Sequence, residues 1–194
     1  WSATGANVLA ADLPVSDLAL ADELLEGIAA VEEPEVILSP YYPLSPALGA
    51  KTVLTIHDLF PLAHPEWTAN GAVAGFFAGP LRRCAEAAAA IIVPSDATRQ
   101  DVVKFYDVEP ARVHVIAHGF THLPEGAAIG TDTGLPGEPY LLFVGAMEPR
   151  KNLPRLPEAY ALLCHGRPAP PALVIATSRG WGTGSLRAML EKHP

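Results

Sequence analysis

Short apolar runs that alternate with helical segments are the feature that most limits how this chain can fold. Each run is rich in β-branched or aliphatic residues, and the runs are EVILS (35–39), KTVLTI (51–56), AIIVP (90–94), RVHVI (112–116), YLLFV (140–144) and PALVIAT (171–177). Such runs between helices are typical of a parallel sheet that is covered on both faces. The sequence therefore predicts an α/β fold with mainly parallel sheets rather than an antiparallel sandwich.

Helical patterns occupy the intervals between these runs. Residues 16–31 place apolar side chains at the spacing of one helix face, and residues 71–89 read as helical with an interruption at Gly79-Pro80. Residues 96–106 follow Ser95, a residue type that caps helix N-termini. A fourth helix should begin at about residue 156 or 157, after an irregular turn, because Pro157 has no N–H and is tolerated only in a first turn.

The composition and hydrophobic pattern of the chain change after His118-Gly119. Residues 118–138 are dense in Gly, Pro and Thr and show no apolar period, so they are expected to be a linker. Residues 1–117 and 139–194 should then form two doubly wound units, neither of them complete. Trp1 opens the chain without an initiator Met, which favours a fragment of a longer protein.

Charge and composition exclude several classes of function. The first 50 residues hold eight acids and no Lys or Arg, and the other 144 hold 13 acids and 13 bases, so the net charge of −8 lies in the N-terminal quarter. Nucleic-acid binding is not expected, because it needs a basic face. No apolar run reaches 18 residues, so no transmembrane segment is expected. Cys84 and Cys164 read as reduced thiols of a cytoplasmic protein.

Polar residues follow two of the expected strands at the end where ligands bind in open α/β sheets. His57-Asp58 follows KTVLTI, and Gly145, Arg150 and Lys151 follow YLLFV. Two cations beside a helix start suit a diphosphate, and the glycine allows close approach of the backbone.

An alternative for these two cations stays open on the residues alone. Arg150 and Lys151 can instead belong to a solvated loop and pair with Glu148 and Glu158, because basic residues are common in loops.

Three stretches taken together resemble glycosyltransferase family 4. They are VLTIHDLFPLAHPEW, CAEAAAAIIVPSDATRQDVVKFYDVEPARVHVIAHGF and YLLFVGAMEPRKNLPRLPEAY, and the resemblance runs over most of residues 35–182. It implies retaining enzymes of GT-B architecture, with two Rossmann-like domains and an active site in the cleft between them. The forms IHDLFPLAHPEW and EPRKN are most similar to a mannosyltransferase-like branch that often uses GDP-mannose.

The resemblance implies a role for each site residue. His57 would lie near the transferred sugar in the acceptor-side domain (residues 1–117), with Asp58 and Ser95 as further acceptor or sugar contacts. Gly145, Arg150 and Lys151 would bind the donor diphosphate in the domain that starts at residue 139. The expected partners are a GDP- or UDP-linked sugar and a glycan or lipid-linked acceptor, with no metal and no cofactor. The expected location is cytoplasmic, or peripheral at the inner face of the membrane.

Departures from the family pattern leave other hypotheses in view. Ala146 stands where an Arg is commoner, Pro154 and Pro157 fall at the helix start, and the family's glycine-rich N-terminal loop and paired C-terminal glutamates are absent from the sequence. A non-catalytic nucleotide-sugar-binding fragment is therefore one alternative. Residues 179–185 (RGWGTGS) weakly favour a dinucleotide-binding protein. A zinc site at His114, His118 and His122 needs a helix, which Gly119 would break.

Overall fold

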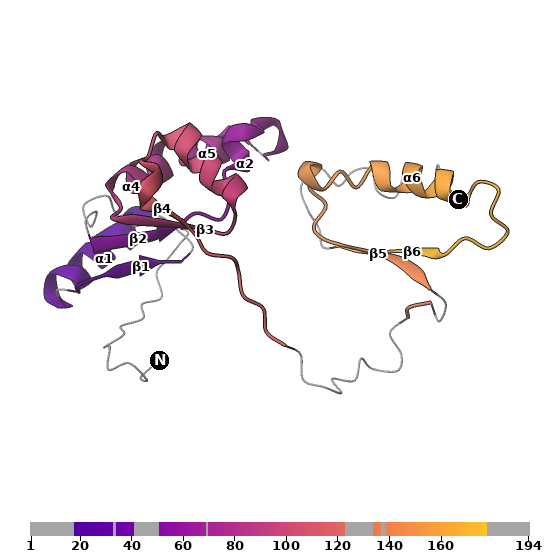
Figure 1. Ribbon diagram of the computed structural model, residues 1–194, viewed down its shortest axis with the longest axis horizontal. Helices are drawn as coiled ribbons and strands as arrows, with labels where there is room; N and C mark the ends of the chain where they lie inside the picture. The colour runs from indigo at the N-terminus through magenta and orange to yellow at the C-terminus, as the bar shows by residue number, and fades with distance from the viewer. Residues whose placement is uncertain are drawn as a thin grey trace. The chain divides into compact units, whose positions relative to one another are not determined.

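The computed structural model describes residues 18–32, 34–40, 51–68, 70–122, 134–136 and 139–177. The chain divides into two compact units, residues 1–63 with 72–118 and residues 64–71 with 119–194. Each unit contains one parallel sheet (Figure 1). The RGWGTGS stretch and much of the expected linker lie outside the described residues.

The first unit is built on a four-stranded sheet of order β1-β2-β3-β4, and every neighbouring pair is parallel. The strands are β1 (Ile37–Ser39), β2 (Thr52–Thr55), β3 (Ala90–Val93) and β4 (Val113–Val115). All four runs that the sequence marked as strands in this part of the chain are present, each one or two residues shorter than expected. The central strands β2 and β3 alternate buried with half-buried residues, which fits a sheet with neighbours on both edges.

Helices and short turns make up the rest of this unit, and some of them supply residues to the core of the sheet. The elements are α1 (Leu18–Glu32), α2 (Phe60–Ala63), α3 (Gly71–Phe76), α4 (Arg82–Ala87) and α5 (Asp96–Tyr106), with a short 3-10 turn, η5 (Pro110–Arg112), before β4. Figure 1 shows α4 and α5 over the same face of the sheet. Right-handed crossovers between strands in sequential order place their helices on one face. The buried core of this unit comprises Leu54, Ile56, Leu59, Leu81, Cys84, Ala85, Ala88, Ile91, Val93, Val102, Tyr106, Val108 and Val113.

The expected interruption at Gly79-Pro80 is a π-helical turn, η4 (Phe77–Leu81), between α3 and α4. Pro80 has no N–H to donate and would strain a regular α-helix at this point. One wider turn absorbs the proline, so the helical path continues from α3 into α4. The helix over residues 71–87 is therefore confirmed, with a local change of hydrogen-bond pattern in place of a break.

The second unit has a two-stranded parallel sheet, β5 (Tyr140–Val144) and β6 (Ala172–Ala176), with α6 (Arg155–Cys164) over one face (Figure 1). Two 3-10 turns, η3 (Pro65–Trp67) and η6 (Pro149–Lys151), also belong to it. The helix α6 begins one residue earlier than expected. Pro157 is its third residue, in the first turn, where a missing N–H leaves no hydrogen bond unmade.

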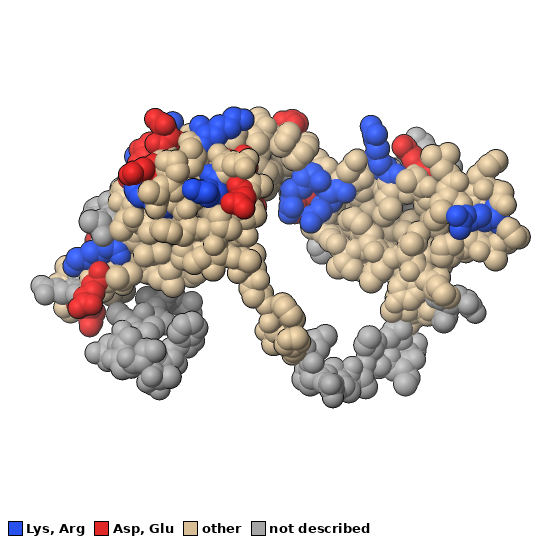
Figure 2. Space-filling view, viewed as in Figure 1, with Lys and Arg blue, Asp and Glu red and all other residues tan. Residues whose placement is uncertain are grey.

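The α/β fold class with two Rossmann-like parallel-sheet units is confirmed by these sheets. Acidic and basic side chains lie interspersed over the helices of the first unit on the side that Figure 2 shows, so no basic face appears there. Within the described ranges, no helix is long and apolar enough to cross a membrane.

Candidate functional site

The sheet of the first unit brings two histidines to its carboxyl edge from strands that are not neighbours. The Ile56 N–H donates to the carbonyl oxygen of Ile92 at 2.9 Å, and the Ile116 N–H donates to that of Val93 at 2.9 Å. These bonds extend β2 and β4 along the two sides of β3. His57 follows the first bond directly, and His118 comes two residues after the second. Each parallel neighbour is about 4.8 Å away, so side chains from β2 and β4 can meet across the end of β3.

His57 is held at both ring nitrogens. Its Nε2 lies 2.9 Å from the carbonyl oxygen of Pro40, the residue that follows β1. Its Nδ1 lies 3.4 Å from Nε2 of His118, and the two ring centroids are 5.2 Å apart at an interplanar angle of 31°. The carboxyl ends of β1, β2 and β4 thus supply the three parts of one contact network.

The N-terminus of α5 secures the backbone of His57. Ser95 is the N-cap, and its Oγ accepts from the Thr98 N–H at 3.2 Å. The Thr98 hydroxyl donates to the carbonyl oxygen of His57 at 3.4 Å and is buried. Ser95 and His57 therefore lie at one edge of the sheet, with the serine oxygen engaged in capping. Asp58 is exposed, and no described residue donates a hydrogen bond to its carboxylate.

In the second unit, the expected donor-binding residues lie together after β5. Gly145 donates its N–H to the carbonyl oxygen of Ala176 at 3.1 Å, at the end of the β5–β6 ladder. A Cβ atom at Gly145 would meet the Phe143 ring at 3.6 Å and Lys151 Cε at 3.9 Å, which are ordinary contacts. The packing of the unit therefore tolerates a methyl group at this position. The contacts within the unit do not require a glycine here, so they give no support to the expectation that a ligand approaches the Gly145 backbone closely.

The two cations differ in what they contact. Arg150 Nε donates to Glu148 Oε2 at 2.6 Å, as the solvated-loop alternative supposed. Lys151 is exposed and forms no ion pair with any residue that the structure describes. Both lie in η6, which Asn152 ends with left-handed backbone at φ 50°. One cation is therefore partly neutralised by a carboxylate, whereas no described residue neutralises the other.

Metal binding finds no support in the described part of the chain, where no three His, Cys, Asp or Glu residues gather into a possible site. His114 lies on β4, so the helical spacing of His114, His118 and His122 is not realised. Sequence reasoning weighed His118 only as a zinc ligand. The rule that selected His57, a polar residue just beyond a strand, would also have selected His118.

Comparison with known proteins decides the family. The model of Glycosyltransferase Family 4 matches residues 9–122. The chain belongs to this family. The match includes His57 and Ser95, and it ends before Gly145, Arg150 and Lys151.

Three curated relatives match the chain at modest identity. The chain is 26% identical over 148 residues to an O-antigen chain mannosyltransferase B of Escherichia coli. The aligned region covers 73% of this chain and 39% of the relative. It is 28% identical over 165 residues to a serotype-specific mannosyltransferase WbdA of Escherichia coli, an alignment that covers 76% of this chain and 20% of the relative. It is 31% identical over 172 residues to an alpha-maltose-1-phosphate synthase of Mycolicibacterium smegmatis, covering 75% and 44%. The chain thus spans less than half the length of each.

Proposed function

We propose that this chain carries part of a retaining hexosyltransferase that uses a nucleotide-diphosphate sugar. Two of the relatives are named mannosyltransferases, so mannose is the sugar that we propose first, with a GDP- or UDP-linked donor. The acceptor would be a hydroxyl of a glycan or of a lipid-linked sugar. The observation that carries the proposal is the family match over a unit whose His57 is fixed at the carboxyl edge of a parallel sheet.

The proposed reaction exchanges one bond at the anomeric carbon for another. The bond between C1 and the diphosphate oxygen breaks, and a bond from C1 to the acceptor oxygen forms on the same face of the sugar. The proton of the acceptor hydroxyl passes to the departing diphosphate, which leaves as the nucleoside diphosphate. Negative charge grows on that leaving group, so fixed cations lower the barrier most when they contact it.

The residues of this chain would divide the work between the two units. Lys151 and Arg150 would bind the diphosphate, with Lys151 the stronger contributor because Arg150 is already paired with Glu148. The backbone at Gly145 would approach the same group. His57 would orient the sugar or the acceptor by hydrogen bonds, and Asp58 and Ser95 would lie beside it. The proposed roles of the residues in each unit can be tested separately.

The test combines a binding and a transfer measurement. Calorimetric titration of the chain with GDP and with UDP should detect one nucleotide, and a transfer assay with the matching nucleotide-linked hexose should detect release of that nucleotide. His57→Ala should lower turnover and leave nucleotide affinity unchanged, because His57 lies in the first unit. Binding without turnover would favour the alternative of a non-catalytic nucleotide-sugar-binding protein. The absence of both would overturn the proposal.

A further inference from the structure

The contact between His57 and His118 assigns hydrogen positions to both imidazoles. The carbonyl oxygen of Pro40 can only accept, so His57 Nε2, at 2.9 Å, must carry the hydrogen and donate it. In a neutral imidazole the other nitrogen is then a bare acceptor. The group opposite His57 Nδ1 is Nε2 of His118 at 3.4 Å, so His118 Nε2 is the donor there.

We propose that His118 is a positioning residue, which donates to Nδ1 of His57 and so fixes the plane of that ring at the carboxyl edge of the sheet. The order of the hydrogen bonds is His118 Nε2–H to His57 Nδ1, and His57 Nε2–H to the carbonyl oxygen of Pro40. Both rings are then Nε2–H tautomers. The partner of a histidine's other nitrogen commonly sets its tautomer and orientation.

The backbone around the pair makes such an arrangement precise. The carbonyl oxygen of His57 accepts from Thr98, which is buried at the start of α5. Main chain and ring of His57 are therefore held by separate elements, α5 on one side and the segments after β1 and β4 on the other. A ring held at both nitrogens loses rotational freedom before any ligand arrives, which lowers the entropic cost of aligning a ligand.

The assignment also says what His57 offers to a hydroxyl ligand. The 2.9 Å bond to Pro40 is the shorter of the two contacts, and the 3.4 Å contact to His118 is the one that a ligand displaces more easily. A sugar or acceptor hydroxyl that reaches His57 would then donate to Nδ1. This consequence rests on the proposed function, whereas the hydrogen-bond assignment does not.

The experiment measures the ring nitrogens directly. The whole chain is labelled with ¹⁵N-histidine, and ring correlations are recorded at about pH 8, where a neutral imidazole dominates. His57→Gln and His118→Gln each remove one of the seven histidine ring patterns, which assigns both residues. We expect two Nε2–H tautomers and, for His57 Nδ1, the resonance position of a nitrogen that accepts a hydrogen bond.

Variants at residue 118 separate the donor from the ring. His118→Phe keeps a planar ring without a donor and should move the His57 Nδ1 resonance toward that of a free acceptor, with Nε2–H unchanged because Pro40 still accepts. His118→Gln places an amide N–H at similar reach and should restore the original position. His122→Phe, in the same exposed segment, is the matched control and should change nothing at His57. Circular dichroism checks that each variant is folded.

The ¹⁵N resonances test the hydrogen bond between His118 and His57 without any measurement of sugar transfer. An Nδ1–H tautomer at either residue, or an Nδ1 resonance of His57 that stays in place in the Phe variant, would overturn it. A shift that Gln does not reverse would show a contact between rings rather than a hydrogen bond, and would also overturn it. In the transfer assay, His118→Phe should lower kcat/KM for the acceptor by roughly 10- to 100-fold at unchanged KM for the donor, and Gln should recover most of it. Failure of transfer in the unaltered chain would count against the proposed function alone.

Discussion

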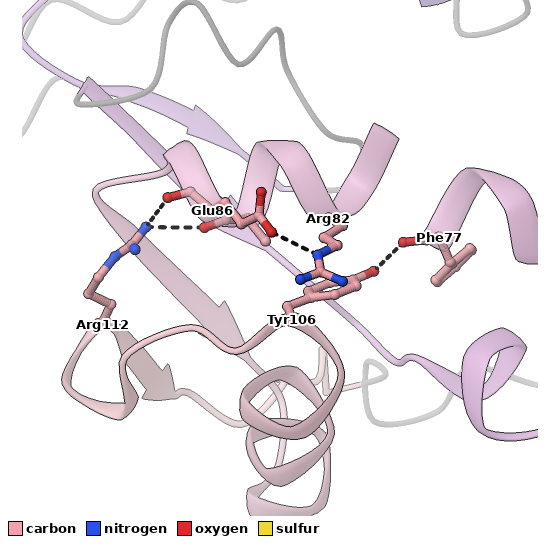
Figure 3. Close-up of polar contacts among 6 residues, drawn as sticks. Phe77, Arg82, Glu86, Tyr106 and Arg112 are labelled. Carbon is pink, nitrogen blue, oxygen red and sulfur yellow. Dashed lines mark hydrogen bonds and ion pairs between the residues drawn. The ribbon is translucent and has the colours of Figure 1, made fainter. Parts of the chain in front are cut away.

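The hydroxyl of Tyr106 donates a 2.8 Å hydrogen bond to the carbonyl oxygen of Phe77 (Figure 3). Tyr106 is the last residue of α5 and is 1% exposed, and Phe77 opens the π-helical turn between α3 and α4. The bond therefore ties the end of one helix to the point where the other departs from α-helical geometry.

Tyr106→Phe should lower the free energy of unfolding by about 1 kcal/mol, because the ring stays packed while a part-buried carbonyl loses its donor. Urea unfolding followed by circular dichroism measures this change. Tyr140→Phe is the matched control, since no described residue receives a hydrogen bond from that hydroxyl, and it should change stability by less than about 0.5 kcal/mol. Equal stability of the Tyr106→Phe protein and the unaltered chain would mean that the bond contributes nothing net.

The same hydroxyl should make the chain sensitive to alkali. Burial raises the pKa of Tyr106 far above its ordinary value of 10.0, because the phenolate is poorly solvated there. The folded state therefore keeps its proton more tightly than the unfolded chain, so the contribution of Tyr106 is complete below pH 10 and declines as the pH rises above it. The stability difference between the unaltered chain and Tyr106→Phe should therefore shrink between about pH 10 and pH 11. A constant difference across that range would contradict the prediction.

Arg112 stabilises the end of α4 in the same region (Figure 3). Its Nη2 donates to the carbonyl oxygens of Ala85 and Glu86, each at 3.1 Å, and also to that of Ala88. These carbonyls lie in the last turn of α4 and at its C-cap, Ala88, where they have no N–H partner within the helix. The guanidinium thus acts as a side-chain cap from the turn before β4.

Arg112→Ala should cost about 1.5–3 kcal/mol of unfolding free energy, the range for hydrogen bonds that involve a charged donor. Arg112→Lys should recover only part, because one ammonium cannot reproduce the planar fork. Arg83→Ala removes an exposed cation from α4 and should change stability by less than about 0.5 kcal/mol. Thermal unfolding of the three variants gives the order, and an Arg112→Ala protein as stable as the Arg83→Ala control would refute the cap.

The sequence predicted the strands well because each is a compact apolar run between turn residues. The position of Pro157 also predicted the start of α6 to within one residue, since a residue without an N–H fits only the first turn of a helix. Gly79-Pro80 was harder to interpret. A proline inside a helical pattern predicts a disturbance of the helix but not its form. In the structure the disturbance is a π turn instead of a break, and the Tyr106 hydroxyl donates to the carbonyl oxygen of Phe77 in that turn.

The contacts of the candidate site depended on register, which a single sequence does not reveal. His57 and His118 are 61 positions apart, and they meet because β2 and β4 run parallel on the two sides of β3. A shift of one residue in either strand would turn one ring away from the other. The ion pair of Arg150 with Glu148 is local and was among the alternatives, but its geometry depends on the 3-10 turn that contains Arg150 and has Glu148 as its N-cap.

Glu148→Gln tests whether that ion pair competes with a nucleotide. The Arg150 and Glu148 side chains are 36% and 21% exposed, so solvent screens the pair and its own contribution to stability is small. A diphosphate would have to replace the carboxylate at the guanidinium. Removing the negative charge should therefore raise affinity for GDP or UDP by about two- to fivefold in a calorimetric titration, with the gain reduced at high salt. A fall in affinity would mean instead that Glu148 positions Arg150 for the ligand.

Lys151→Ala tests the cation that no described residue neutralises. If Lys151 binds the diphosphate, its loss should weaken nucleotide binding by about 1.5–3 kcal/mol, the value of a charge-assisted hydrogen bond. In the transfer assay it should cost roughly 2–4 kcal/mol of transition-state stabilisation, because charge on the leaving group grows as the bond breaks. Lys151→Arg should recover part of the affinity. Arg155→Ala, an exposed cation in the first turn of α6, is the control and should bind as the unaltered chain does. Equal affinity in the Lys151→Ala and Arg155→Ala proteins would show that Lys151 belongs to a solvated loop, as the alternative holds.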